Sequence, residues 1–510
     1  MSACAARDCC ADARIRLGVL RRPQRSAPDG LRDLAGHAPT TRKDSMNVVF
    51  VGGGSFRTLP IVRGVLLNPK VLDGGEIRLV DFNLPRVETV GRLIMQTPEF
   101  AAAGCKVVWT DKLEEALPGA DVVSISFPVG SHKVNSLSDQ ACAAHGLFGS
   151  DQISASGAFR AVTGGTIVLE IARKMEKHCP DAWLFDYANP VAVYSGMVNN
   201  HTKIRALGIC AGFTNHRWDL PRLIFGRDEY CNEFEGVAAA GINHCSILLR
   251  GTLHGRDIYE LIDEAIGVEG WEPCRIPKFP NSETYIRRQL GLLAEMRRRF
   301  GYVVFSTEGD GFSHICPELY LEPTGGWQKP LSVAAIEKRA KEQAVAREEL
   351  DQTFHDHLHQ DLPASFWAQD RLQNPHFAAS PDDAACVVLR GLSGQSREWL
   401  AASLPNNGAV KGFKDRTILE YSFTLDQNGV HPDSDLEVPD CFQGLMSALA
   451  THQTLLGDAI ATRDPRLFAQ ALFAYPLHQN EPETRALWKE LLTIHADEMP
   501  AVFQNARDYC

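Results

Sequence analysis

The stretch NVVFVGGGSFRTLP, residues 47–60, decides the fold that the sequence predicts. A short apolar run leads into three consecutive glycines, and a helix-like segment follows. Glycines at the end of a strand permit a tight turn and let backbone N–H groups approach a pyrophosphate at the N-terminus of the next helix. The pattern therefore predicts a dinucleotide-binding turn, with Gly52 and Gly54 as its first two glycines.

The match to the G-x-G-x-x-G fingerprint is partial, because Arg57 occupies the third glycine position. A glycine turn without a ligand is the alternative. Asp81 ends the next predicted strand, where a carboxylate accepts hydrogen bonds from the adenosine ribose and repels a 2′-phosphate. We therefore predict NAD in preference to NADP, although Asp81 lies further from the turn than the usual ~20 residues. Ser55 and Asn83, in the same two motifs, complete this part of the predicted cofactor site.

Short β-rich segments alternate with helix-like segments from Met46 onward, which predicts βαβ units and a parallel sheet. The fold class is therefore α/β, with a Rossmann-like parallel sheet and helices on both faces over residues 46–230. Beyond that point long helical charge patterns mix with strand-like segments, which predicts an α+β domain over residues 231–510. Residues 1–45 show no periodicity and predict a flexible arm. The strand-like segments after the first are EIRLVDFN (76–83), CKVVWT (105–110), ADVVSISF (120–127) and AWLFDYANP (182–190).

Composition narrows the class of protein. The 510 residues are 44% hydrophobic and 23% charged, near the average of soluble globular proteins. A net charge of -11 disfavours a nucleic-acid partner. No apolar run approaches the ~20 residues that span a bilayer, and scattered cysteines favour reduced thiols. We expect a cytoplasmic protein with a small-molecule partner and no membrane partner.

Several motifs together resemble the NAD- and metal-dependent glycoside hydrolases of family 4. They are FVGGGS, RLVDFN, DYANPVAV, GIC, GINH, RRFGYVVFSTEGD and LPNNGAVKGF, in that order, and the resemblance runs from Met46 to about residue 480. It implies a Rossmann domain like that of lactate dehydrogenase, a homodimer or homotetramer, and a carbohydrate substrate. Family members include α-glucosidases, α-galactosidases, 6-phospho-glycosidases and uronide-cleaving enzymes.

The resemblance also implies a reaction. The sugar is oxidised at C3 by NAD, a base removes the C2 proton, the leaving group is eliminated, water adds, and the ketone is reduced again, a route outside the usual two-carboxylate mechanism. This chemistry needs nicotinamide, a Lewis acid, a base and an acid. We expect a small α-glycoside as the substrate, with a hexuronide or a galactoside as candidates.

For the Lewis acid, the resemblance assigns Cys210 in GIC and His244 in GINH as ligands of Mn²⁺ or another divalent metal. From the residues alone, a single cysteine at a strand end is more often a small buried apolar residue, and a histidine is often part of the core. A thiolate and an imidazole also suit Zn²⁺ or Fe²⁺, so the identity of the ion stays open.

Two carboxylates match the positions of the acid and the base. The resemblance assigns Asp151 to the leaving group and Arg160, nine residues later, to the substrate. Asp310 matches the base, with Glu308 and Tyr302 as alternatives. Local explanations remain open for both carboxylates, because an aspartate also caps helices and the sequence TEGDG is typical of a surface turn.

Two asparagines complete the predicted site. Asn189 ends a strand that the resemblance places near the nicotinamide ribose and the sugar, where an amide can both donate and accept. We assign it to the cofactor and to the substrate, and the peptide Asn189–Pro190 is a candidate for the cis form. Asn243, next to His244, is expected to contact the substrate or to support that ligand.

The chain departs from the family at two places. The family commonly has histidine or aspartate after the metal cysteine, where this chain has Ala211, and the usual D-T-x-G-P-G-G reads DQISASG at 151–157. His216 is a candidate to compensate. An unusual substrate, a related reaction or an impaired site would each fit. Two alternatives to hydrolysis therefore stay open: an NAD-dependent sugar or hydroxy-acid dehydrogenase or epimerase, and a non-catalytic nucleotide sensor.

Overall fold

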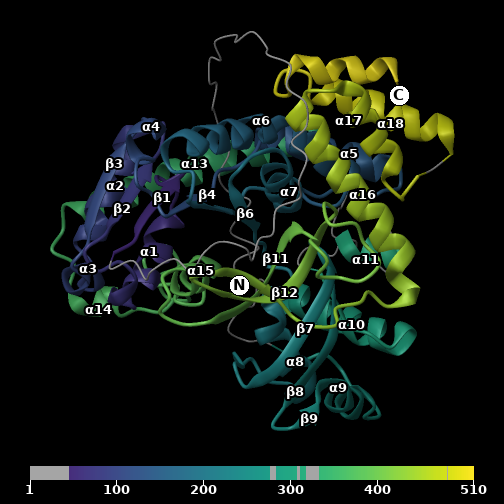
Figure 1. Ribbon diagram of the computed structural model, residues 1–510, viewed down its shortest axis with the longest axis horizontal. Coiled ribbons are helices and arrows are strands. Elements are labelled where there is room, and N and C mark those ends of the chain that lie inside the picture. Colours follow the sequence, from purple (N-terminus) through teal and green to yellow (C-terminus); the bar gives the residue numbers. More distant parts are fainter. Residues whose placement is uncertain (1–44, 276–282, 307–309, 318–331, 479, 510) are drawn as a thin grey trace.

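The computed structural model describes residues 45–275, 283–306, 310–317, 332–478 and 480–509. The predicted N-terminal arm lies almost wholly outside the described residues and stays a prediction. A single sheet runs through the molecule in the order β10-β8-β7-β12-β11-β6-β5-β4-β1-β2-β3, and helices surround it (Figure 1). No described helix is long and apolar enough to cross a membrane.

The first half of the sheet is parallel. Its order, 3-2-1-4-5-6, is that of a Rossmann fold and confirms the α/β prediction. The strands are β1 (Asn47–Val51), β2 (Glu76–Val80), β3 (Lys106–Thr110), β4 (Val122–Ile125), β5 (Trp183–Asp186) and β6 (Arg205–Gly208). The helices between them are α1 (Thr58–Leu66), α2 (Leu84–Met95), α3 (Pro98–Ala103), α4 (Leu113–Ala116), α5 (His132–Ala144), α6 (Ala155–His178) and α7 (Val191–His201).

The second half of the sheet is antiparallel and joins the first half where Ser403 of β11 pairs with Gly208 of β6. These antiparallel strands account for the strand-like segments that the sequence shows after about residue 230. The division into domains at that residue stays a prediction. Its strands are β7 (Phe234–Ile242), β8 (Cys245–Leu253), β9 (Arg256–Asp257), β10 (Val304–Phe305), β11 (Glu398–Pro405), β12 (Ile418–Asp426) and β13 (Gly429–Pro432).

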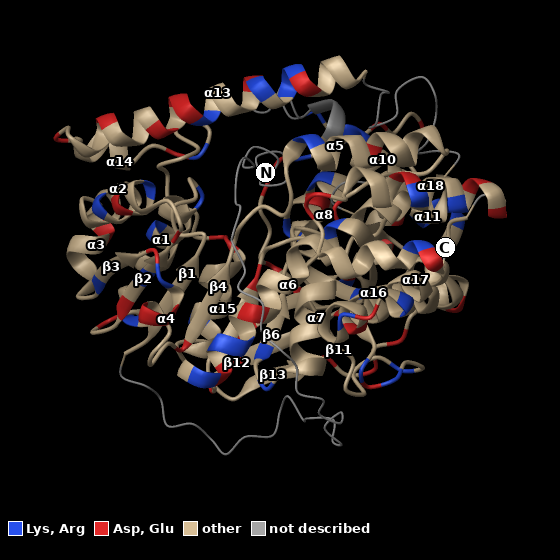
Figure 2. Cartoon of the chain, turned by 90° about the horizontal axis from the view of Figure 1, so that it is seen from above, with Lys and Arg blue, Asp and Glu red and all other residues tan. Residues whose placement is uncertain are grey.

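Helices of the second half lie around this extension and also reach back to the first half. In Figure 2 the long helix α13, dense in charged residues, runs beside α2, and its Asp351 bonds to Arg86 of α2. Buried apolar side chains of both halves belong to one core cluster. The helices are α8 (His216–Phe225), α9 (Ile258–Ile266), α10 (Glu283–Phe300), α11 (Asp310–Ile315), α13 (Val333–Leu358), α14 (Ala364–Trp367), α15 (Ala384–Leu392), α16 (Asp440–Thr462), α17 (Pro465–Ala474) and α18 (Glu481–Ile494).

The glycine turn, residues 52–55, follows β1 and depends on glycine for a steric reason. The N–H groups of Gly52 and Gly53 both donate to the carbonyl oxygen of Val80 at 2.9 Å, which ties the turn to the end of β2. Gly52 has a φ of +86°, and a Cβ there would lie 2.2 Å from the carbonyl oxygen of Ser126. Another residue at position 52 would therefore displace either β4 or the turn.

Candidate active site

Of the predicted cofactor residues, Gly52, Gly54, Ser55, Asp81 and Asn83 lie together at the carboxyl ends of β1 and β2, whereas Asn189 follows β5. The Gly54 N–H donates to Asp81 Oδ2 at 3.0 Å, and a Cβ at Gly54 would lie only 2.9 Å from that oxygen. Asp81 Oδ1 accepts from the Asn83 N–H at 3.0 Å. A carboxylate oxygen has two lone pairs, so both oxygens of Asp81 retain the capacity to accept from ribose hydroxyls. The arrangement fits the adenosine side of a dinucleotide.

Ser55 and Asn83 have local roles in this structure. The Ser55 N–H closes the glycine turn by donating to the Gly52 carbonyl at 2.9 Å. Asn83 Oδ1 accepts from the Arg86 N–H at 3.2 Å and caps helix α2. Contacts of both residues with a cofactor stay predictions.

Cys210 and His244, predicted as metal ligands, are brought together from separate halves of the sheet. Cys210 follows β6, whereas His244 lies in the two-residue turn between β7 and β8. Cys210 Sγ lies 3.2 Å from His244 Nε2. Metal–sulfur and metal–nitrogen bonds measure about 2.3 and 2.0 Å for zinc, so one cation can contact both atoms at once.

The turn that carries His244 is held in an uncommon conformation. His244 has a φ of +65°, which few residues other than glycine adopt. Helix α11 begins against this turn, where a Cβ at Gly311 would lie 2.0 Å from the His244 carbonyl oxygen. The close approach of α11 therefore depends on glycine at position 311.

Asp310 contacts the ring nitrogen of His244 that points away from Cys210. Its Oδ1 lies 2.9 Å from His244 Nδ1, and its Oδ2 accepts from Ser150 Oγ at 2.7 Å. Ser306 Oγ also donates to Oδ1, at 3.3 Å, and the Asp310 side chain is fully buried. A carboxylate on Nδ1 fixes the ring orientation and leaves Nε2 for Cys210 or a metal.

The charges of this pair depend on each other. Burial opposes the charged form of His244, but Asp310 and Cys210 outweigh it and raise the pKa of the imidazole well above its usual value. Burial likewise opposes the charged form of Asp310, yet His244 and the hydrogen bond from Ser150 bring the pKa of the carboxyl below its usual value. Without a cation, the buried residues therefore favour an ion pair.

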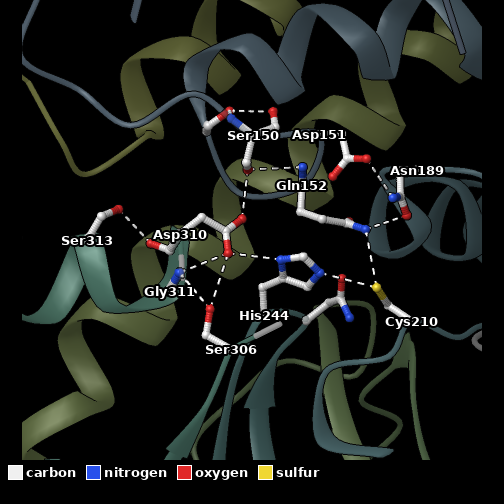
Figure 3. A network of polar contacts seen from close by, with 12 residues as sticks. Ser150, Asp151, Gln152, Asn189, Cys210, His244, Ser306, Asp310, Gly311 and Ser313 are labelled. Carbon is white, nitrogen blue, oxygen red and sulfur yellow. Dashed lines mark hydrogen bonds and ion pairs between the residues drawn. The ribbon is translucent and has the colours of Figure 1, made fainter. Parts of the chain in front are cut away.

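Gln152 closes these contacts into a ring. Its backbone N–H donates to Ser150 Oγ at 3.2 Å, and its side-chain Nε2 lies 3.7 Å from Cys210 Sγ. Figure 3 shows the result, a closed set of polar contacts between four separate parts of the chain. We call this set the polar ring; its members are Ser150, Gln152, Cys210, His244 and Asp310.

Asp151 and Asn189 adjoin the ring. Asn189 Nδ2 donates to Asp151 Oδ2 at 2.8 Å, and Asn189 Oδ1 accepts from Gln152 Nε2. The peptide Asn189–Pro190 is cis. Ser154, not Asp151, caps helix α6, because Ser154 Oγ accepts from the Gly157 N–H at 2.9 Å. The structure therefore excludes helix capping as the explanation for Asp151.

Three oxygen atoms beside the ring are buried and, within the described part of the chain, have no hydrogen-bond partner. They are Asp151 Oδ1, Gln152 Oε1 and Asn243 Oδ1. Buried acceptors are normally paired, so these oxygens suit a guest that brings cations or hydroxyl groups. Among the described residues no three His, Cys, Asp or Glu side chains form a metal cluster. A metal on Cys210 and His244 would therefore need further oxygen ligands from water, substrate or an amide.

A buried carboxylate supports the turn from the other side. Asn243 Nδ2 donates to Glu420 Oε2 at 2.7 Å, and Ser246 Oγ donates to the second carboxylate oxygen. Burial raises the pKa of Glu420 in spite of these two hydrogen bonds. Glu420 comes from β12 and thereby links the antiparallel strands to the turn that carries His244.

Arg160, predicted to bind substrate, is engaged elsewhere in this structure. Its Nη2 lies 2.5 Å from Asp139 Oδ1 and 3.1 Å from the carbonyl oxygen of Asn135, both on α5. Its substrate contact stays a prediction and requires that it exchange these partners.

Tyr302 and His216, two of the alternative residues, make their contacts away from the polar ring. The Tyr302 ring packs on Tyr259 and Phe442, with centroid distances of 6.2 and 6.3 Å, and Glu308 lies outside the described residues. His216 stacks on Phe213, and its Nδ1 lies 2.9 Å from that residue's carbonyl oxygen. Burial lowers the pKa of His216 to about 3. His216 therefore belongs to the core and does not take the place of a polar residue at Ala211.

Four residues of the site were not predicted. Ser150, Gln152, Ser306 and Glu420 all bond to ring members or to Asn243. A signal for Ser150 and Gln152 was available, because both are neighbours of Asp151 and Gln152 lies in the segment 151–157 that departs from the family. For Glu420 no local signal exists, since its sequence, ILEYSFTLD, is typical of any strand.

Two profiles of one enzyme family match most of the chain. The profile of the Family 4 glycosyl hydrolases matches residues 47–222, and the profile of their C-terminal domain matches residues 239–478. The chain belongs to the family 4 glycosyl hydrolases. This confirms the resemblance and identifies the protein as an enzyme of this family of glycosidases.

Relatives of this family 4 glycosyl hydrolase cover nearly the same length. A probable 6-phospho-beta-glucosidase of Bacillus subtilis is 23% identical, over 90% of this chain and 98% of the relative. An alpha-galacturonidase of Thermoanaerobacter italicus is 22% identical, over 91% and 97%. A solved 6-phospho-alpha-glucosidase from gut microorganisms, in complex with NAD and Mn²⁺, is 17% identical and covers 89% of this chain and 99% of its own, with a TM-score of 0.73. The last likeness shows that the fold is shared.

Proposed function

We propose that this family 4 glycosyl hydrolase cleaves a small α-glycoside with NAD and a divalent metal, Mn²⁺ first, as cofactors. The observation that carries the proposal is the 3.2 Å approach of Cys210 Sγ to His244 Nε2. Bound beside them, NAD would take up and return a hydride while the cation polarised a sugar oxygen. The fold and the NAD- and Mn²⁺-bound structure of a relative support the same choice of cofactors.

The residues present fit a cation of this kind. A thiol sulfur and an imidazole nitrogen lie within reach of one cation, and the unpartnered oxygen of Asn243 belongs to the residue next to His244. A set of sulfur, nitrogen and oxygen donors suits divalent transition metals. Asp310 would hold the imidazole with Nε2 free for the cation.

We assign Asp151 to the proton that the leaving group needs. Its Oδ2 is held by Asn189, while its Oδ1 is buried and has no hydrogen-bond partner in the described residues. A carboxyl oxygen held on one side and open on the other can deliver a proton to a bound group within hydrogen-bond reach.

The contacts of Asp310 bear on its role as the base. Asp310 matches the family position, but both of its oxygens accept hydrogen bonds and its side chain is fully buried. These contacts support a role in orienting His244. To act on a sugar C–H bond, Asp310 would have to release at least one of these partners, so we propose orientation as its first role.

The glycone is proposed as a hexuronide or a galactoside. An alpha-galacturonidase among the relatives supports the uronide, and Arg160 is the arginine that we assign to its carboxylate. The ion pair of Arg160 with Asp139 is the counter-argument, since substrate would have to compete for it. We also propose that the enzyme is a homo-oligomer. We place it in the cytoplasm, and the free thiols of its described cysteines support this location.

A glycoside screen tests the function against its alternatives. Chromogenic α- and β-glycosides are incubated with NAD and Mn²⁺ while aglycone release and NADH absorbance are followed together. Release without net NADH supports the hydrolase, and uptake of solvent deuterium at C2 supports the elimination route. Net NADH formation would indicate a dehydrogenase instead, whereas NAD binding without any turnover would indicate a sensor.

A further inference from the structure

Gln152 differs from the other members of the polar ring because it contributes both its backbone N–H and its side chain. Its backbone N–H donates to Ser150, and its side-chain amide contacts Cys210 and Asn189. The side chain is only 2% exposed. None of the chemistry proposed above uses this amide, although it lies between the candidate acid and the candidate metal ligand (Figure 3).

The orientation of the Gln152 amide follows from its neighbours. Asp151 Oδ2 is an acceptor, so the Asn189 amide must turn its nitrogen toward Asp151 and its oxygen toward Gln152. Asn189 Oδ1 and Cys210 Sγ then both require a donor, and the amide nitrogen of Gln152 supplies it. Two neighbours therefore fix Nε2, and Oε1 is left facing away from them.

The oxygen that remains has no partner among the described residues. Gln152 Oε1 is buried and accepts no hydrogen bond. A buried carbonyl oxygen without a donor is costly, so water fills this place in the free enzyme and a bound guest with a donor can displace it. The amide is neutral and presents an acceptor, so a hydroxyl group satisfies it, whereas a carboxylate or a phosphate, which bring acceptors of their own, does not.

We propose that Gln152 is a substrate-contacting residue whose Oε1 accepts a hydrogen bond from one hydroxyl group of the glycone. Its Nε2 at the same time keeps Asn189 and Cys210 in place. The inference rests on the proposed function, since it assumes that a glycoside binds beside the polar ring. It deepens that function by requiring that the sugar carry a free hydroxyl group, and not an acidic substituent, on the carbon next to Gln152.

Binding of monodeoxy sugars tests the contact directly. The free glycone of the best substrate and each of its monodeoxy derivatives are used as competitive inhibitors of the wild type, of Gln152→Met and of Gln453→Met. Gln453 is the matched control, because it is also a buried glutamine, on α16, and makes none of the contacts of the ring. Methionine preserves side-chain length and removes the amide.

We expect one deoxy position to raise the inhibition constant of the wild type about tenfold over that of the parent sugar. In Gln152→Met that ratio falls to about one, while ratios at the other positions are retained. In Gln453→Met every ratio equals that of the wild type. An unchanged set of ratios in Gln152→Met overturns the inference.

A second variant covers the case in which Gln152→Met does not fold. Gln152→Glu keeps the shape and an acceptor oxygen but loses the donor to Asn189 and Cys210. It should be less active than the wild type and still show the same deoxy penalty; loss of the penalty overturns the inference. If the wild type cleaves no glycoside with NAD and Mn²⁺, the proposed function fails and this inference with it. If the wild type cleaves a glycoside but the deoxy penalties are unchanged in Gln152→Met, or are lost in Gln152→Glu, the inference alone fails.

Discussion

The glycine turn lies at the carboxyl ends of two neighbouring parallel strands, whereas the polar ring joins the end of parallel strand β6 to the turn between antiparallel strands β7 and β8. The two are also assembled over different lengths of chain. In the turn, Gly54 and Asp81 are 27 residues apart and belong to neighbouring strands. In the ring, Cys210 and His244 are 34 residues apart, and Ser150 and Asp310 are 160 apart. The cofactor side therefore depends on one local motif, whereas the reactive side needs both halves of the sheet.

The largest effect should come from breaking the ring at its two candidate ligands. We expect Cys210→Ala and His244→Ala each to lower turnover about 10³-fold or more, because loss of a Lewis acid removes several kcal/mol of transition-state stabilisation. NAD binding, which depends on the turn, should survive in both. Steady-state rates and NAD titrations measure the two effects, with Cys441→Ala, an exposed cysteine, as the control. Wild-type activity in either variant would refute the metal site.

Asp310→Asn should have the next largest effect and separates two roles for this residue. If Asp310 orients His244, the variant loses about 10- to 100-fold in both Mn²⁺ affinity and activity, as is usual for a residue behind a metal ligand. If Asp310 is instead the base, kcat falls while Mn²⁺ affinity stays near that of the wild type. Titration of Mn²⁺ by electron paramagnetic resonance, alongside kinetics, decides between them.

The turn is tested by Asp81→Ala. The variant loses the acceptor for the Gly54 and Asn83 N–H groups and for the ribose, so we expect the Kd for NAD to rise about tenfold. The preference for NAD over NADP should shrink, because the charge that repels a 2′-phosphate is gone. Mn²⁺ affinity should not change. A parallel loss of Mn²⁺ binding would show that the turn and the ring are not independent.

The smallest effect concerns His216, which lies close to Cys210 in sequence but packs into the core. Its pKa is lowered to about 3, so below a pH of about 6.5 the unfolded chain takes up the proton first and the folded state loses stability. Between pH 7.5 and 5.5 this loss is about 1 kcal/mol. In His216→Phe it should be absent, with turnover at pH 7.5 retained.

Urea unfolding of both proteins at the two pH values measures this difference. Since other buried histidines titrate as well, the comparison is between the slopes of the wild type and the variant. Equal pH dependence in the two proteins would contradict the lowered pKa of His216. A large loss of turnover in the variant would indicate a role for His216 in the reaction.

Much of the turn could be predicted from sequence, because its determinants are neighbours. The glycines, the strand before them and Asp81 lie in two short motifs, and the structure brings them together as expected. The parallel strands followed for the same reason, since each is a short β-rich run between helical segments. The continuation of that sheet by antiparallel strands after β6 was not foreseen, because pairing of Ser403 with Gly208 leaves no periodic signal.

The ring could be predicted only in part. Cys210 and His244 were identified through motifs. The motifs imply that the two side chains lie close together, but they do not give the distance between Sγ and Nε2. Gln152 was read only as part of an altered loop, because nothing in its sequence shows that its amide turns toward a cysteine 58 residues away. Asp310 was assigned as a base, whereas its contacts with His244 and Ser150 favour orientation. Side-chain direction, rather than residue type, was the missing information.

The length of chain that the ring encloses also bears on how the protein acquires its activity. The glycine turn is complete once β2 has paired with β1, but Ser150 cannot meet Asp310 until 160 further residues have been made and packed. Contacts between distant residues form slowly, since the intervening chain must first lose its freedom. During synthesis or refolding, the capacity to bind nucleotide should therefore return well before the capacity to turn over substrate, and an early intermediate would hold dinucleotide without any chemistry.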